Sequence, residues 1–333
     1  MPFEQQTVEA RNITLSTNKQ NAFGTALADA AMTLRPPIID PGSFANIKKE
    51  WYSNLQRGNK GHQWATVRQE IGRFTDFQMG GDLDEVLAGW LCAFAFMDVT
   101  TTGAGVKTHA FKPLVSSNQA PVTTIYFEDT ADLKYKMQDL AIAELEISGS
   151  DRGPLQFRAS MVGSGRHTDG AMAAPVASAV GTLLMGNDTD FLIGPSGAAV
   201  SIKEQIRNWS VTFAIGVVPH RAPGGGKFAS FMRLQEFRTR FSATISAKNV
   251  DNIRTLLLND TLQEVQINTN SGAAAQLNIK YPNIYLSAAQ IGVDGMDQVW
   301  QIETDEQAMM KLGASEVVQV SVLNNQATYL VGA

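Results

Sequence analysis

The four histidines are the side chains best suited to acid–base or metal chemistry in this chain. They are His62, His109, His167 and His220, and none stands in an HxxxH or HExxH spacing. Such spacings place two imidazoles on one helix face, where they can hold zinc. Each histidine is therefore expected to be a loop or sheet-surface residue, and a zinc or histidine-base enzyme is not indicated.

Two glycine-rich segments match phosphate-binding motifs only in part. Residues 223–228 read Pro-Gly-Gly-Gly-Lys-Phe, but Arg221 stands where a P-loop requires its first glycine and Phe228 replaces the hydroxyl residue that holds magnesium. Residues 103–105 read Gly-Ala-Gly and lack the third glycine of the dinucleotide fingerprint. We interpret the first segment as a hairpin tip and the second as a turn.

The remaining nucleophiles and carboxylates also lack a catalytic pattern. Ser148 falls outside the GxSxG motif of hydrolases, and Glu144 and Glu146 have the spacing of one solvated strand face. The single cysteine, Cys92, excludes an intrachain disulfide and CxxC metal sites. The sequence therefore predicts neither an enzyme nor a cofactor.

Composition limits the class of protein further. The chain has 333 residues, 44% of them hydrophobic and 18% charged, which suffices for one large domain or two smaller ones. Its net charge of −5 leaves no basic field that would gather nucleic acid from solution. No stretch is expected to insert into a membrane, and the N-terminus lacks the pattern of a secretory signal.

An internal repeat organises the elements that carry these residues. The segment 69–74 resembles 235–241, so that Arg73-Phe74 is matched with Arg240-Phe241. Each segment is predicted to form a β-strand that is followed by a turn and a short helix, with Asp82 and Asn249 as the N-caps.

Further matches follow in the same order along the chain. Trp51 is matched with Trp209, residues 110–113 with 278–281, and residues 145–157 with 289–300. Colinear matches at nearly constant spacing favour two diverged copies of one module. The four tryptophans at 51, 90, 209 and 300 are expected in the cores of these modules.

The residue pattern of each copy is typical of β-structure. Apolar and polar side chains alternate over residues 155–161 and 236–246, as in a strand with one buried face. Residues 317–322 and 327–331 look like a closing hairpin with Asn324-Asn325 in its turn. The predicted fold class is mainly β, with two tandem β-sandwich or barrel modules that each carry one short α-helix.

The predicted boundaries follow from these patterns. Residues 1–41 form an N-terminal arm, 42–165 the first module, 166–197 a Gly-, Ala- and Ser-rich linker, and 198–333 the second module.

Several segments of the first copy resemble the major tail tube proteins of long-tailed, siphovirus-like bacteriophages. The run Lys-Thr-His-Ala-Phe-Lys-Pro-Leu at 107–114, Pro-Val-Thr-Thr-Ile at 121–125, and the serine-glycine stretch at 148–155 occur in that family's order. They lead into Arg-Ala-Ser-Met-Val-Gly at 158–163. The resemblance covers residues 50–165 and, more weakly, the second copy.

The resemblance implies a fold and a role. Family members form a β-sandwich with a flanking helix, and six modules close into a ring whose inner sheets join as one barrel. A duplicated subunit would complete such a ring with three chains, and a ring of six chains stays open. The role implied is a non-enzymatic subunit of the virion tail, assembled in the bacterial cytoplasm. Its partners would be other copies of itself and the tape measure, tail-tip and tail-terminator proteins, with DNA only in transit.

A DNA conduit must not hold DNA, so polar and acidic side chains are expected to line the lumen. The candidate lining residues lie on polar strand faces, and alternation alone leaves open whether some of them face the tube exterior. They are Glu144, Glu146, Gln156, Arg158, Ser160, Gln298, Gln301 and Glu303.

Ring stacking would use the N-terminal arm and the long Gly- or Pro-containing loops at 56–64 and 217–228. The charged and imidazole side chains proposed for stacking are Arg57, Lys60, His220, Arg221 and Lys227.

Two other readings compete with the tail tube. The first is the inner tube of a contractile tail or injection machine, which is built on the same fold. The second is a virion decoration or surface-binding β-sandwich protein, which would form discrete oligomers and no filaments. An enzyme is a third reading, which no residue constellation supports.

Overall fold

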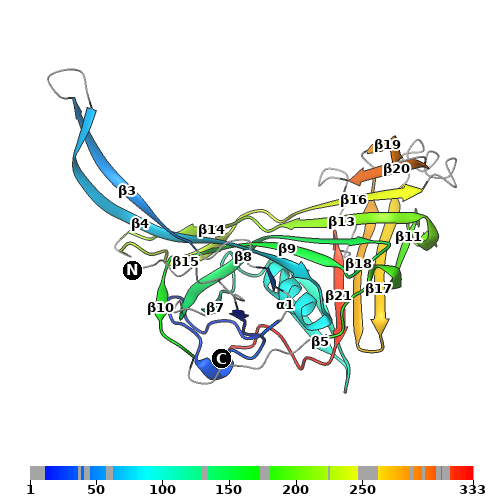
Figure 1. The fold of residues 1–333 in the computed structure, drawn as a ribbon, viewed down its shortest axis with the longest axis horizontal. Helices are drawn as coiled ribbons and strands as arrows, with labels where there is room; N and C mark the ends of the chain where they lie inside the picture. The colour runs from blue at the N-terminus through cyan, green and yellow to red at the C-terminus, as the bar shows by residue number, and fades with distance from the viewer. Residues whose placement is uncertain are drawn as a thin grey trace, which may run out of the picture.

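A computed structural model describes residues 12–36, 39–40, 46–57, 63–128, 134–172, 181–223, 226–246, 262–285, 288–294, 297–304, 309 and 316–332. This part of the chain is mainly β, as predicted, and its strands form antiparallel sheets of twelve, seven and two strands (Figure 1). Within it, no helix is long and apolar enough to cross a membrane.

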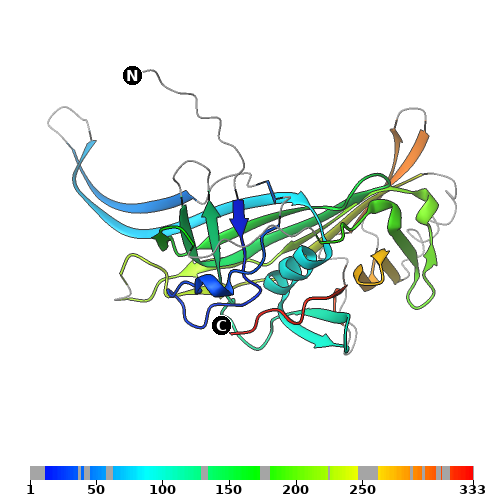
Figure 2. The same cartoon turned by 60° about the horizontal axis from the view of Figure 1, so that its bottom comes forward.

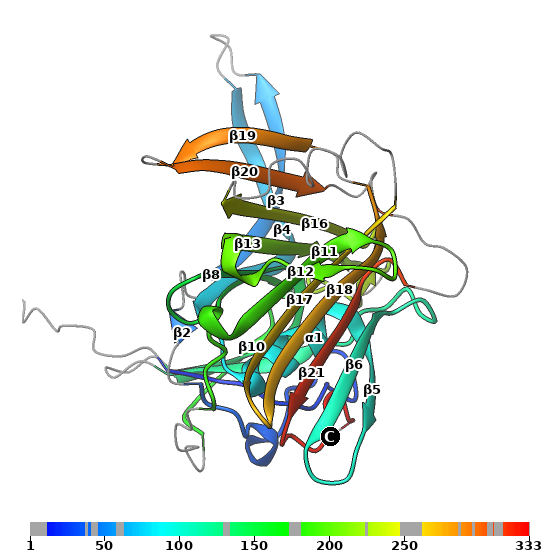
Figure 3. The ribbon, with the colours of Figure 1, turned by 90° about the vertical axis from the view of Figure 1, so that its right-hand side faces the viewer.

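The twelve-stranded sheet runs through both halves of the chain. The order along its main path is β19-β20-β16-β13-β8-β9-β4-β2, and Figure 3 shows β19, β20, β16 and β13 one after another. Their bounds are β2 Ile39–Asp40, β4 Gln63–Asp82, β8 Lys134–Ser150, β9 Gln156–Gly163, β13 Ile206–Ala214, β16 Arg238–Ser246, β19 Ala288–Asp294 and β20 Asp297–Thr304.

Four further strands join this sheet beside its main path. β3 (Asn46–Arg57) pairs with β4 and follows β2 along the same edge. β7 (Thr123–Glu128) and β10 (His167–Asp169) pair with the first part of β8, and β1 (Asn12–Thr14) pairs with β7.

The seven-stranded sheet also draws on both halves, in the order β12-β11-β17-β18-β21-β6-β5. The two halves therefore share both of these sheets, where the sequence suggested a separate sandwich for each. The bounds are β5 Met97–Thr102, β6 Lys107–Pro113, β11 Thr189–Pro195, β12 Val200–Ser201, β17 Gln263–Gly272, β18 Ala275–Ile284 and β21 Gln319–Asn324.

Two expectations near this sheet need correction. β11 lies within the predicted linker, yet it pairs with β17 over seven positions. β21 does not turn back into a closing hairpin, because it pairs with β18 and β6, and residues 327–331 form no strand. The separate two-stranded sheet joins β14 (Val217–His220) and β15 (Phe231–Leu234).

Helix α1 (Glu85–Phe96) lies on one side of the large sheet (Figure 2). Eleven of its twelve residues are buried, which is typical of a helix enclosed by the core. Its N-cap is Asp84, whose side chain accepts a hydrogen bond of 2.7 Å from the Leu87 amide. The predicted cap was Asp82; the chain stays extended beyond it because Leu83 exchanges backbone hydrogen bonds with Leu155 and Leu184.

The predicted alternation is confirmed in β9 and β16, where every second side chain is buried. The match of Phe74 with Phe241 is not supported. Phe241 is buried, whereas in β4 the buried side chains near this position are Thr75, Phe77 and Met79, so Phe74 lies on the opposite face. A shift of one residue moves a side chain to the other face of a sheet. The second predicted helix, at Asn249, falls outside the described residues.

Candidate assembly surfaces

The candidate lining residues gather on one face of the large sheet. Glu146 lies opposite Arg158 and Glu144 opposite Ser160 across β8 and β9, while Glu303 lies opposite Ser242 across β20 and β16. All of these point away from the buried face, as do Gln156 and Gln301. The side chain of Gln298 is outside the described part of the structure. We call this surface the polar face.

The polar face carries both basic and acidic side chains. Arg158, Arg238 and Arg240 stand among the carboxylates of Glu144, Glu146 and Glu303. Hydroxyl side chains fill much of the remainder; the Ser210 and Ser242 hydroxyls, for example, hydrogen bond across β13 and β16 at 2.8 Å. Both charge signs are therefore interspersed in a hydroxyl-rich surface.

A long hairpin of β3 and β4 extends beyond the body of the molecule (Figure 1). Its position explains Trp51, which was expected in a core but is 43% exposed. Trp90 and Trp209 are buried as predicted, and the Trp300 side chain lies outside the described part. We call residues 46–57 and 63–75 the arm; this hairpin is distinct from the N-terminal arm predicted at residues 1–41.

Two of the proposed stacking residues, Arg221 and Lys227, contact the arm within the same chain. Arg221 forms an ion pair with Glu50 and donates a 3.1 Å hydrogen bond to the Arg73 carbonyl. The Lys227 ammonium lies 3.4 Å from a Glu70 carboxylate oxygen, and the Lys227 carbonyl accepts a 2.8 Å hydrogen bond from the Arg73 amide. The loop between β14 and β15 therefore holds the base of the arm. We call the contacts of Arg221 and Lys227 with the arm the brace.

The other stacking candidates do not join this contact. The His220 ring packs against Phe231, with ring centroids 4.6 Å apart. Lys60 and the Arg57 side chain lie outside the described part.

Glu70 is the central acid of the brace. Its carboxylate pairs with the guanidinium of Arg73 and with Lys227. Hydrogen bonding to Arg73 is the main cause that lowers the Glu70 pKa from 4.5 to about 2. The carboxylate therefore stays charged through all but strongly acidic conditions.

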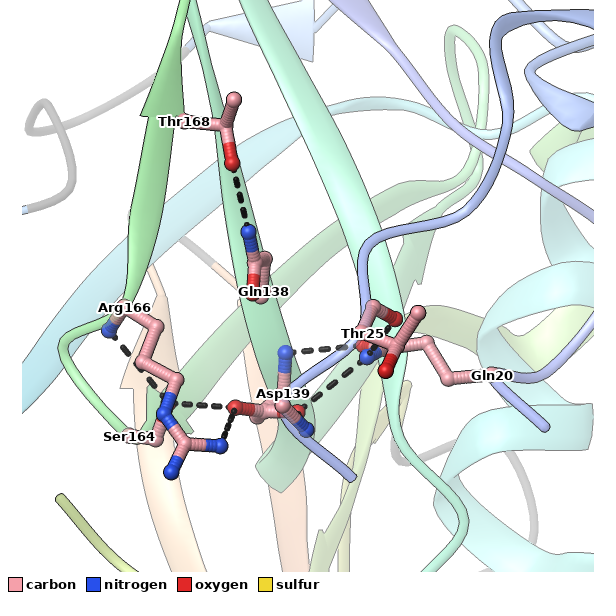
Figure 4. A network of polar contacts seen from close by, with 8 residues as sticks. Gln20, Thr25, Gln138, Asp139, Ser164, Arg166 and Thr168 are labelled. Carbon is pink, nitrogen blue, oxygen red and sulfur yellow. Dashed lines mark hydrogen bonds and ion pairs between the residues drawn. The ribbon is translucent and has the colours of Figure 1, made fainter. Parts of the chain in front are cut away.

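A buried polar network fastens the N-terminal segment to the sheets (Figure 4). Asp139, fully buried in β8, accepts hydrogen bonds from the Gln20 side chain at 3.1 Å and from the Gly24 amide at 2.6 Å. Its other oxygen accepts from the Ser164 hydroxyl at 2.5 Å and lies 3.7 Å from Arg166. Pairing with these groups compensates the burial of the charge.

Arg166 links this network to the brace. Its guanidinium lies over the rings of Phe23 and Phe228, at 5.7 and 5.0 Å from their centroids. Phe228 also lies beneath Arg73, at 5.7 Å. The N-terminal segment, β8 and the arm base are thus joined through a short chain of contacts.

His109 is buried, although a loop or surface position was expected. Its Nε2 lies 3.0 Å from Asn324 Oδ1 and 3.1 Å from the Gln326 carbonyl, so it carries the proton, and Nδ1 accepts from the Thr101 hydroxyl at 2.9 Å. Burial lowers the His109 pKa below its ordinary value. The neutral ring joins β6 to the C-terminal segment.

Among the described residues, no group of three or more His, Cys, Asp or Glu side chains is placed to hold a metal ion. No protein-family model matches the chain, and no curated protein is significantly similar to it.

Sequence reasoning predicted a strand at 69–74 and a loop at 56–64, but it did not predict the length of the hairpin arm or its brace. The arm is hidden because residues 46–57 and 63–75 lack a clear apolar alternation, although hairpin pairing defines both strands. The brace is hidden because its acids, Glu50 and Glu70, are distant in sequence from Arg221 and Lys227.

Proposed function

We propose that this chain is a structural, non-catalytic subunit of a bacteriophage tail tube, which assembles into stacked rings around a lumen for DNA. The observation that supports this most directly is the strand order of the large sheet. The strands β19, β20, β16 and β13 lie side by side in this order, and β8, β9, β4 and β3 follow in the same sheet. The short strand β2 lies on the same edge of β4 as β3. On our proposal the two sets of four strands are two copies of one unit, arranged head to tail.

Burial patterns support this correspondence. Thr239-Arg240-Phe241 in β16 and Thr75-Asp76-Phe77 in β4 both place a threonine and a phenylalanine in the core. In each copy this strand also pairs with the second strand of a hairpin. β4 pairs with β9, and β16 pairs with β20. The first proposed module has the predicted limits of 42–165, and the second, predicted at 198–333, also takes in β11, which pairs with β17.

The junction between the units favours assembly into a ring. β13 pairs with β8 over seven residues, so one unit continues the sheet of the other without a break. Repeating this junction from chain to chain extends the sheet, and closure leaves no unpaired edge. Three chains would then supply six units.

The polar face suits the lumen of such a ring. Its interspersed arginines and glutamates give phosphates no continuous basic track to bind, and its hydroxyl groups keep the surface wetted. DNA would be a passing cargo, while the stable partners would be neighbouring copies and the proteins at the ends and along the axis of the tail.

Electron microscopy of the purified protein in negative stain tests this function. Hollow tubes with a regular axial repeat are expected after concentration, and averaged end views should show six-fold features built from three chains. Discrete closed oligomers that never elongate, even when purified tail-tip complexes are added as initiators, would contradict the proposal and favour a virion surface protein.

A further inference from the structure

We infer that neighbouring copies join by antiparallel pairing of β3 with β19, with Ile47 opposite Ala289 and Lys48 opposite Ala288. The inference deepens the proposed function, on which it rests, by specifying the partner and register of the chain-to-chain contact. It comes from the junction that the chain already makes within itself.

The two strands are edge strands at opposite ends of the described large sheet. β19 pairs with β20, and β3 pairs with β4; neither has a second partner among the described strands. Both would expose backbone donors and acceptors in a single copy. Such edges are templates for pairing with another chain.

Register on the β3 side follows from the buried threonines. Phe213 of β13 pairs with Thr239, and Ile47 of β3 pairs with Thr75. Ile47 therefore holds the position in the first unit that Phe213 holds in the second. Ile47 is also partly buried and packs against the core, as its counterpart does.

Register on the β19 side follows from Met79 and Ala243, which lie two residues after the buried Phe77 and Phe241. Met79 pairs with Ala159, which pairs with Leu145 of β8. In the second unit Ala243 pairs with Ile302, which pairs with Ala289 of β19.

Ala289 therefore corresponds to Leu145. Inside the chain, Phe213 lies opposite Leu145 and Ala214 opposite Glu144. Transfer of this junction to the free edges gives Ile47 opposite Ala289 and, one residue along, Lys48 opposite Ala288. Lys48 and its counterpart Ala214 both lie on the side of the sheet that carries the polar face.

Cysteine cross-linking tests the register. A chain with Lys48→Cys and Ala288→Cys places two thiols opposite each other across the proposed junction, where Cα atoms of antiparallel partners lie about 4.5–5.5 Å apart, within disulfide range. Within one chain the two positions are on opposite edges of the large sheet, so only neighbouring copies can be linked. Cys92 is buried with its pKa raised to about 12, which keeps it unreactive.

The matched control is Lys48→Cys with Gly292→Cys, which moves the second thiol four residues along β19, about 13 Å. Mild oxidation should convert most of the first variant into a ladder of covalent oligomers, and the control should stay at the level of the single-cysteine variants. Both variants must melt like the parent protein.

The outcomes separate the register from the function. Tubes that form normally while the matched pair cross-links no more than the control would overturn the register and leave the tail tube standing. A covalent ladder that ends in closed rings, with no tubes under any condition, would support the register and overturn the tail tube.

Discussion

Glu70 links pH to the stability of the arm. Its pKa falls from 4.5 to about 2 in the folded chain, so its stabilising contribution is complete above about pH 4.5 and is lost as the pH falls toward 2. The melting temperature of Glu70→Gln should therefore lie below that of the parent protein at neutral pH. The difference should close between pH 4.5 and 2 in thermal melts.

Glu236→Gln is the matched control, since Glu236 pairs with Arg238 on an exposed surface where ion pairs contribute little. A Glu70→Gln melting difference that stays constant down to pH 2 would refute the role assigned to this carboxylate.

Asp139 should be among the most costly polar residues to remove. Asp139→Ala leaves Gln20, Ser164 and Arg166 without their shared acceptor, and we expect a loss of about 3 kcal/mol in the free energy of unfolding by urea titration. Asp139→Asn should cost less, because asparagine also tolerates the φ of 58° found here.

Asp169→Ala removes an 82% exposed carboxylate and should change the free energy of unfolding by about 0.5 kcal/mol or less. Equal effects at positions 139 and 169 would be inconsistent with a buried network.

Sequence reasoning could not recover these residue roles. The spacing of the histidines shows no catalytic motif around His109. The burial of His109 depends on β21 and the C-terminal segment, which lie more than 200 residues away in sequence. Arg221 and Lys227 belong to a segment whose composition is typical of an exposed loop tip. Only the folded structure brings Glu50 and Glu70 close to them.

At the scale of elements, the cap of α1 offers a direct test. Asp84→Ala should lower the free energy of unfolding by about 1 kcal/mol, because the Leu87 amide loses its acceptor. Asp82→Ala should cost about 0.5 kcal/mol or less, since Asp82 ends β4 and caps nothing. Urea titrations of the two variants compare them, and the reverse order would place the helix start at Asp82.

The face assignment of β4 can be tested with two phenylalanines. Phe77→Ala should cost about 3–5 kcal/mol, because the ring is 1% exposed and meets the Phe127 ring edge-on at 5.0 Å. Phe74→Ala should cost about 1 kcal/mol, because that ring lies on the other face beneath Lys48. Similar losses in chemical denaturation would contradict the assignment.

Periodicity predicted β9, β16 and α1 because each is long and amphipathic or uniformly apolar. It placed the cap two residues early because Asp82 and Asp84 are equally good caps in isolation. What decides between them is the pairing of Leu83 with Leu155 and Leu184, which local sequence does not contain.

At the scale of the whole molecule, the decisive feature is that both halves share the twelve-stranded and the seven-stranded sheet. Residue patterns predicted a mainly β chain, but the pairing of β13 with β8 joins strands that are separated by β9 to β12 in sequence. Period-2 patterns specify which face of a strand is buried, not which strand lies beside it. The same limit applies to the contacts between copies.

The central claim is that one sheet continues across chain boundaries with its polar face toward the lumen. A cryo-electron microscopy map of the assembled protein, at a resolution that separates strands, tests this most directly. We predict an unbroken antiparallel barrel in which β19 of each copy lies beside β3 of the next and Glu144, Glu146 and Arg158 face the channel. Copies that meet through other surfaces, or a channel lined by the seven-stranded sheet, would contradict it.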